Sequence, residues 1–104
     1  MYKAEYLPLA AADILEAEEY LYELSPPAAD KFTEAIEEKV NNLLEQPLMY
    51  KVYEDNNYFR CMPLPYKYLC FYHIDEDAKI IKIHRILHGM RDIPNFLAAP
   101  SEDI

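Results

Sequence analysis

YFRCMPLPYKYLCFYHIDEDAKIIKIHRIL, residues 58–87, contains three runs of β-branched and aromatic residues, the residue types that favour strands. Two short groups of turn-forming residues, Pro65-Tyr66 and Asp75-Glu76-Asp77, separate these runs. The runs cover residues 58–64, 67–74 and 79–87. The segment therefore predicts a meander of three consecutive strands.

Two amphipathic helices are predicted before these strands, one over residues 8–24 and one from Pro26 to about Gln46-Pro47. Apolar residues recur three and four apart in both, which is the pattern of a helix with one buried face. Ser25 suits the N-cap of the second helix, and Pro26 suits its first position. The first helix is expected to bury Ala10, Ile14, Ala17, Leu21 and Leu24 and to expose Asp13, Glu16, Glu19 and Glu23; the second is expected to bury Ala29, Phe32, Ile36, Val40 and Leu43.

The opening residues, Tyr2 to Tyr6, alternate aromatic and polar side chains and predict a short strand that can add to an edge of the sheet. The order strand, helix, helix and three strands is typical of the α+β class. We expect an antiparallel two-helix hairpin packed on one face of a mainly antiparallel four-stranded sheet. The 104 residues form a single domain, with residues 98–104 expected to be a frayed tail.

Charge is unevenly distributed along the chain. The formal net charge is −9, from 10 basic and 19 acidic residues, which argues against a general nucleic-acid-binding protein. Residues 1–50 contain 11 acidic and 3 basic residues, whereas residues 51–104 contain 8 and 7. Any chemistry directed at an anion is therefore expected in the second half.

Composition predicts a cytoplasmic protein. The longest uncharged apolar stretch, Leu7 to Ala12, is much shorter than the roughly 20 residues of a membrane-spanning helix, and residues 1–5 show no secretion signal. Two cysteines fit reduced thiols in the cytosol. His73, His84, His88, Cys61 and Cys70 lack the spacing of a zinc site, so neither a metal nor another cofactor is expected.

Two segments resemble the RelE/ParE toxin superfamily. SPPAADKFTEAI at 25–36, followed by LLEQP at 43–47, looks like the second helix of that superfamily. RILHGMRD at 85–92 looks like its closing motif, in which the last strand runs into His-Gly-x-Arg-Asp. The resemblance implies the toxin of a bacterial type II toxin–antitoxin module, a growth inhibitor that a co-encoded antitoxin neutralises.

The superfamily contains two mechanisms, and the resemblance allows both. In the ribonuclease branch, which cuts messenger RNA on the ribosome, the catalytic set would be Arg60, Lys67, His88 and Arg91. Met62 stands where that branch often has a second lysine, and Phe96 or Leu97 stands near its late Tyr or His. The sequence is therefore closer to the ParE-like branch, which is directed at DNA gyrase.

In the ParE-like branch, the residues implied in target or partner binding are Arg85, Arg91 and Asp92. The alternatives are the ribonuclease and a toxin-fold protein that only binds its antitoxin. Simpler structural roles stay open as well. Arg91-Asp92 can be a charge pair that caps a closing turn, His88 can be a packed histidine, and Arg60 or Arg85 can be solvated or salt-bridged.

The expected partner is the cognate antitoxin, through which an oligomer can form. We expect it to bind across the helical hairpin and the exposed sheet. The glutamates of the first helix require that its segment either carries basic residues facing them or avoids that surface. The cellular target would be DNA gyrase, or the ribosome and its messenger RNA.

A last prediction concerns the cysteines. If Pro65-Tyr66 forms a two-residue hairpin turn, Cys61 and Cys70 lie directly opposite each other on neighbouring strands. We expect them to be adjacent, reduced and without a catalytic or metal-binding role.

Overall fold

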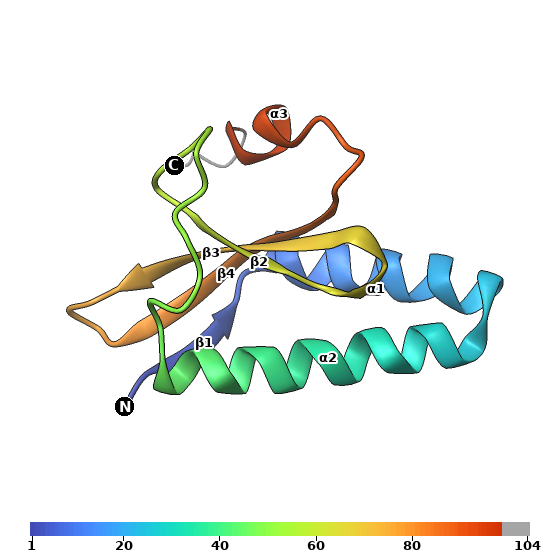
Figure 1. The fold of residues 1–104 in the computed structure, drawn as a ribbon, viewed down its shortest axis with the longest axis horizontal. Helices are drawn as coiled ribbons and strands as arrows, with labels where there is room; N and C mark the ends of the chain where they lie inside the picture. Colours follow the sequence, from blue (N-terminus) through green and yellow to red (C-terminus); the bar gives the residue numbers. More distant parts are fainter. Residues whose placement is uncertain (99–104) are drawn as a thin grey trace.

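The computed structural model describes residues 1–98, which form one sheet and three α-helices (Figure 1). The elements are β1 (Lys3–Tyr6), α1 (Pro8–Leu24), α2 (Pro26–Glu45), β2 (Arg60–Pro63), the 3₁₀ turn η1 (Pro65–Lys67), β3 (Tyr68–Asp75), β4 (Ile80–His88) and α3 (Ile93–Ala98). The predicted order of strand, two helices and three strands is confirmed. The expected tail is outside the described residues from residue 99 onward.

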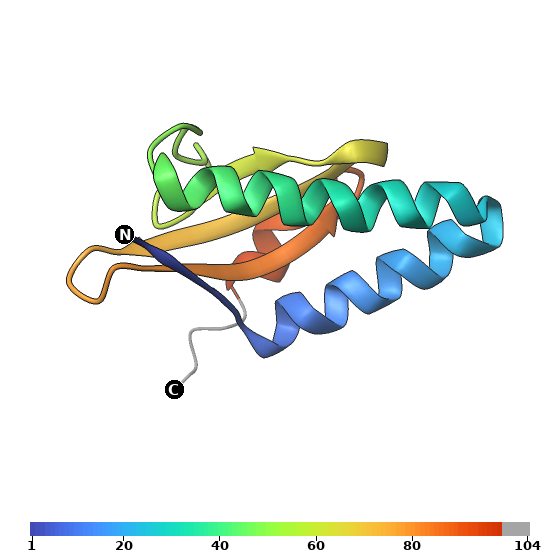
Figure 2. The ribbon, with the colours of Figure 1, turned by 90° about the horizontal axis from the view of Figure 1, so that it is seen from below.

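The four strands lie in the order β1-β4-β3-β2. β1 runs parallel to β4, while the β4–β3 and β3–β2 pairs are antiparallel, so the sheet is mixed and mainly antiparallel as predicted. The antiparallel hairpin of α1 and α2 covers one face of the sheet (Figure 2). No helix within residues 1–98 has an apolar run long enough to cross a bilayer.

The core between the helices and the sheet follows the predicted periodicity with two exceptions on α1. All five apolar residues predicted for α2 are buried, from Ala29 to Leu43. On α1, Leu24 is 66% exposed because the tip of the hairpin extends past the end of the sheet (Figure 1). Asp13, expected on the solvent side, is instead only 8% exposed. These two assignments were wrong.

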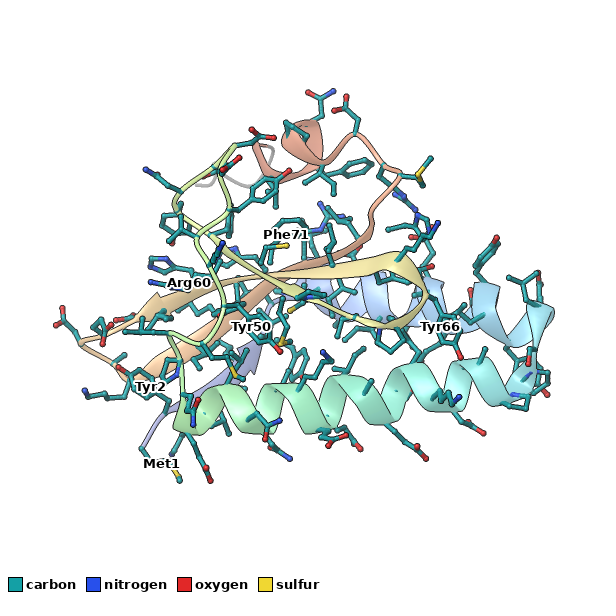
Figure 3. All side chains as sticks on the ribbon, in the orientation of Figure 1. Met1, Tyr2, Tyr50, Arg60, Tyr66 and Phe71 are labelled. Atoms are coloured by element: carbon teal, nitrogen blue, oxygen red, sulfur yellow. The ribbon has the colours of Figure 1, made fainter. Side chains whose placement is uncertain are left out.

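The opposite face of the sheet has its own, smaller core. Phe59, Phe71, Leu87, Ile93 and Leu97 form a buried cluster on this side. Figure 3 shows Phe71 between the sheet and α3, the short helix that the sequence did not predict. The sheet is therefore enclosed by apolar side chains on both faces, and α3 is held against the second face by its own buried residues.

The turn between β2 and β3 is one residue longer than predicted. Its three residues include Tyr66 and Lys67 at φ 62° and 66°, and the Leu64 N–H donates to the Tyr68 carbonyl at 2.9 Å. This turn pairs Cys61 with Phe71 and not with Cys70. Because side chains alternate between the faces of a sheet, the two thiols lie on opposite faces, and the predicted register was wrong.

We expect the two thiols to react separately and to form no intramolecular disulfide. Burial raises the pKa of Cys61 to about 11 and raises that of the fully buried Cys70 further. At pH 8, iodoacetamide should therefore label Cys61 slowly and Cys70 only after unfolding, since the thiolate is the reactive form. Mass spectrometry of peptides from native and urea-unfolded protein measures both. Equal labelling rates in the native protein would contradict the register.

Candidate functional site

The closing segment 85–92 begins with an arginine that is buried and not on the surface. Arg85 is 8% exposed, and its guanidinium forms a two-point ion pair with Asp13 of α1. Nε lies 2.8 Å from Oδ2 and Nη2 lies 3.0 Å from Oδ1. Arg85 is therefore salt-bridged, as one of the simpler alternatives proposed. Its guanidinium is too deeply buried to contact a partner directly.

Asp13 also accepts a backbone hydrogen bond from β4 at a point where β1 no longer pairs with that strand. β1 pairs with β4 only from Ile80 to Ile83, and beyond that point the chain leaves the sheet to enter α1. The Ile86 N–H, which has no β1 residue opposite, donates instead to Asp13 Oδ2 at 2.9 Å. Asp13 therefore satisfies a backbone group and a buried charge at once. One signal could have revealed it, because Ala10, Asp13 and Ala17 follow the same three-and-four spacing as the apolar stripe.

Arg91 is the exposed arginine of the segment. Its Nη2 lies 3.4 Å from Glu16 Oε1 on α1, and its guanidinium carbon lies 5.2 Å from the centre of the Phe96 ring. The Arg85 guanidinium lies 5.5 Å from the centre of the same ring. Phe96, which the family resemblance placed only near the late Tyr or His of the ribonuclease branch, thus serves as an aromatic support for two cations.

Asp92 and Gly89 shape the loop that carries Arg91. The Asp92 carboxylate accepts a hydrogen bond of 2.8 Å from the Asn95 amide at the start of α3, while Arg91 pairs with Glu16. Gly89 is not at a positive φ. Its N–H donates to the Lys67 carbonyl at 2.7 Å, and an added Cβ would lie 3.2 Å from that oxygen. The close approach of two backbone segments therefore favours glycine here, since any side chain would crowd the Lys67 carbonyl.

His88 lies beside Arg91 in a groove between α1 and the end of β4. Its Nδ1 accepts a hydrogen bond of 3.2 Å from the Met90 N–H, so the proton of the neutral ring is on Nε2, and its ring contacts the edge of Tyr68. The groove has a volume of about 350 Å³. Its lining includes Glu16, Tyr20, Tyr68, His88, Met90 and Arg91.

Arg60 is separated from this groove. Its Nη1 donates to the Tyr50 carbonyl at 2.7 Å, and both residues are labelled in Figure 3. Arg60 pairs with Tyr72 on β3, whereas His88 pairs with Tyr68, four residues along the same strand and about 13 Å away. Arg60 instead lines a second cavity of about 210 Å³. Of the predicted nuclease residues, the structure brings His88 and Arg91 together and leaves Arg60 apart.

Lys67, the remaining predicted nuclease residue, is exposed in the η1 turn. Its carbonyl is fixed by the Gly89 N–H, so the turn that carries it lies beside the closing segment. The Lys67 side chain is not among the residues that line the groove, so only the backbone of this turn is shown to meet the closing segment.

A histidine cluster occupies the second face of the sheet. The His73 ring stacks on Tyr58 at 3.9 Å, and its Nδ1–H donates to the Tyr58 carbonyl at 3.0 Å. His84 contacts Tyr58 and Phe59 edge-on, and its buried Nε2 has no hydrogen-bond partner among the described residues. Across residues 1–98, no three His, Cys, Asp or Glu side chains are grouped so as to hold a metal ion.

We expect His84 to destabilise the fold in mild acid. Burial, followed by the charges of His73 and Lys82, lowers the pKa of His84 from 6.5 to about 4. The unfolded chain therefore binds more protons between about pH 6.5 and 4, and the free energy of unfolding falls as the pH drops through this window. The full shift corresponds to about 3 kcal/mol, which partial exposure of the ring reduces to roughly 1–2 kcal/mol.

Urea unfolding at pH 7 and pH 4.5 measures this loss. The His84→Phe variant should lose less stability than the wild type between the two pH values. A control Tyr20→Phe variant, which changes an exposed aromatic side chain and no histidine, should lose as much as the wild type. An identical loss in wild type and His84→Phe would show that other groups cause the acid sensitivity.

The sequence matches a toxin family, and the fold matches chains of two toxin–antitoxin systems. The profile of the ParE toxin of type II toxin–antitoxin systems (parDE) matches residues 4–93. A chain of the chromosomal ParDE system from P. aeruginosa is 23% identical, with a TM-score of 0.68 over 85% of this chain and 95% of that one. A chain of the intact E. coli RelBE toxin–antitoxin complex is 13% identical, with a TM-score of 0.62 over 88% and 100%. No curated protein sequence matches the chain.

Proposed function

Because this chain belongs to the ParE toxin family of type II toxin–antitoxin systems, we propose that it arrests growth by binding DNA gyrase and not by cutting messenger RNA. One observation carries this proposal: the residues that a ribonuclease would need are divided between two places. His88 and Arg91 line the groove beside α1, while Arg60 lines the separate cavity near Tyr50. A toxin that acts by binding alone does not require them to converge.

The chemistry of RNA cleavage explains why this division matters. Attack of a 2′-hydroxyl on the neighbouring phosphate needs a base, an acid and cations within hydrogen-bond reach of one phosphate. Met62, where the nuclease branch often has a lysine, is fully buried in the core, and Phe96 has no proton to transfer. His88 accepts the Met90 N–H at Nδ1, so it can take up a proton there only by losing the bond that shapes the loop.

The closing segment supplies the proposed contact surface. Met90, which is 82% exposed, Arg91 and Asp92 lie on a loop between two anchored elements, β4 and α3. Methionine and arginine are enriched in protein interfaces, and a rigidly held loop loses little conformational entropy on binding. We assign target binding to Arg91 and Asp92, with Arg85 acting from beneath the surface.

Inducible expression in bacteria, together with two assays of the purified protein, tests the proposal. We expect growth arrest with filamentous cells, inhibition of gyrase supercoiling in vitro and no cleavage of ribosome-bound messenger RNA. Cleavage that an Arg91→Ala substitution abolishes would establish the ribonuclease instead. Absence of growth arrest at high expression would indicate a protein that only binds its antitoxin.

The antitoxin is the second partner, and the helical hairpin offers it an acidic groove. Four carboxylates surround this groove between α1 and α2, which has a volume of about 640 Å³. Tyr22, which is 62% exposed, lies among them, and Leu15 is 63% exposed about two helical turns away on the same side of α1. The lining residues are Glu18, Glu19, Tyr22, Glu23, Ala29, Asp30 and Thr33. We propose that a basic, amphipathic antitoxin segment covers this surface.

Neutralising the groove is expected to weaken antitoxin binding. The triple variant Glu19→Gln/Glu23→Gln/Asp30→Asn should bind the product of the small open reading frame beside the gene roughly 5–30-fold more weakly at low salt, and its affinity should depend less on salt. Isothermal titration calorimetry measures both effects.

The matched control for this experiment removes the same charge elsewhere on α2, at Glu34, Glu38 and Glu45, by substitution with Gln. If the control and groove variants bind the antitoxin equally weakly, the loss of affinity is due to the change in net charge and not to the groove. Unchanged affinity in the groove variant would mean that the antitoxin avoids this surface.

A further inference from the structure

We propose that Asp13 and Arg85 are positioning residues that set the orientation of Arg91 on the surface, with the Phe96 ring as the link between them. The inference rests on the proposed function in one respect, namely that Arg91 contacts the target. Neither Asp13 nor Arg85 can make such a contact, because each is 8% exposed.

The first step is the fixed guanidinium of Arg85. Two parallel hydrogen bonds to Asp13 allow this planar group only one orientation. Its remaining nitrogen, Nη1, points away from Asp13 and donates to the Phe96 carbonyl at 3.4 Å. A single side chain on β4 thereby connects α1 with α3.

The second step is the dependence of α3 on that connection. A helix of six residues has no stability of its own, so its position is set by its contacts with the rest of the protein. Ile93 and Leu97 attach it to the second core, while the Phe96 carbonyl is held by Arg85. Loss of the Arg85 contact leaves the rotation of α3 about its axis less defined, and the Phe96 ring turns with it.

The third step is the contact between the Phe96 ring and Arg91, through which the position of α3 affects the orientation of Arg91. Its guanidinium lies over the Phe96 ring, and Glu16 approaches it from α1 at 3.4 Å. Both members of that ion pair are substantially exposed, so it contributes little free energy. The ring therefore supports the Arg91 guanidinium independently of this ion pair. Glu16 and Asp13, three residues apart on one face of α1, thus each hold one arginine of the closing segment.

An NMR measurement distinguishes positioning from general structural support. The Phe96 ring current should shift the Arg91 δ protons upfield in the wild type. This shift should disappear in Phe96→Leu, persist in Phe96→Tyr and shrink in Arg85→Lys, which keeps the charge next to Asp13 but loses the planar fork. Arg60→Lys, which removes an equivalent fork near Tyr50, should leave the Arg91 shift unchanged.

Gyrase association of the same folded variants completes the test. Phe96→Leu and Arg85→Lys should associate roughly fivefold more weakly or worse, Phe96→Tyr should restore association, and Glu38→Gln on the outer side of α2 should not change it. An unchanged Arg91 shift in Arg85→Lys, or full association after the shift is lost, would overturn the inference. If the wild type does not bind gyrase, the proposed function fails, and the NMR result still decides whether Arg85 positions Arg91.

Discussion

Replacing Asp13 by Ala should lower the free energy of unfolding by about 3–5 kcal/mol, a large share of the 5–15 kcal/mol typical of a domain. The substitution leaves the Arg85 charge buried without its partner and leaves the Ile86 N–H without an acceptor. Urea unfolding followed by circular dichroism measures the change. Glu16→Ala, which removes a carboxylate one turn along the same helix, should change stability by no more than about 0.5 kcal/mol, because its ion pair is exposed.

A double variant tests whether the loss of stability comes from the unpaired charge of Arg85 or from lost packing around Asp13. The double variant Asp13→Ala/Arg85→Met should be more stable than Asp13→Ala alone, because it no longer contains an unpaired buried charge. A loss below 1 kcal/mol in Asp13→Ala would show that water or another group compensates Arg85.

Replacing Arg91 by Ala should weaken binding to gyrase about 30-fold or more and abolish growth arrest, as expected for an arginine at the centre of an interface. Stability should change by less than about 0.5 kcal/mol, because the side chain is exposed. Arg91→Lys should retain part of the binding, since it keeps the charge but loses the planar group that lies over Phe96.

Surface plasmon resonance against immobilised gyrase, with growth curves in parallel, measures these effects. Lys31→Ala, which removes an exposed cation from α2, serves as the charge-matched control. Full growth arrest by a folded Arg91→Ala protein would place the target contact elsewhere.

Most of the fold was predictable because its signals are local. The spacing of apolar residues in α2 and the turn residues around β3 follow from neighbouring positions in the chain, and the structure confirms both elements. The register of β2 and β3 was not predictable, since nothing in the residue types of Tyr66 and Lys67 reveals their positive φ angles. The helix α3 was not predicted because its six residues are too few to define a periodic pattern, although Ile93, Phe96 and Leu97 follow the helical spacing.

The candidate site was predictable only in part, for a different reason. Arg91 and Asp92 were identified from the closing motif, and both lie on the surface as a binding role requires. Arg85 was identified from the same motif, but its partner, Asp13, lies 72 residues earlier. The spacing of Asp13 within the apolar stripe indicates that it is buried, but no local pattern shows that it pairs with Arg85. The pairing is found only when the path of the chain is known.

The pairing of β1 with β4 also affects how the protein emerges during synthesis. Lys3 is made before its partner Ile80, which follows 77 residues later, an interval of roughly 4–15 s at ordinary translation rates. Until then the nascent chain holds an acidic helical hairpin without a sheet to cover it, and residues 85–92 are made after that. A chain whose synthesis stops before β4 therefore lacks an inner strand of the sheet and the closing segment, so the proposed target contact requires synthesis through residue 92.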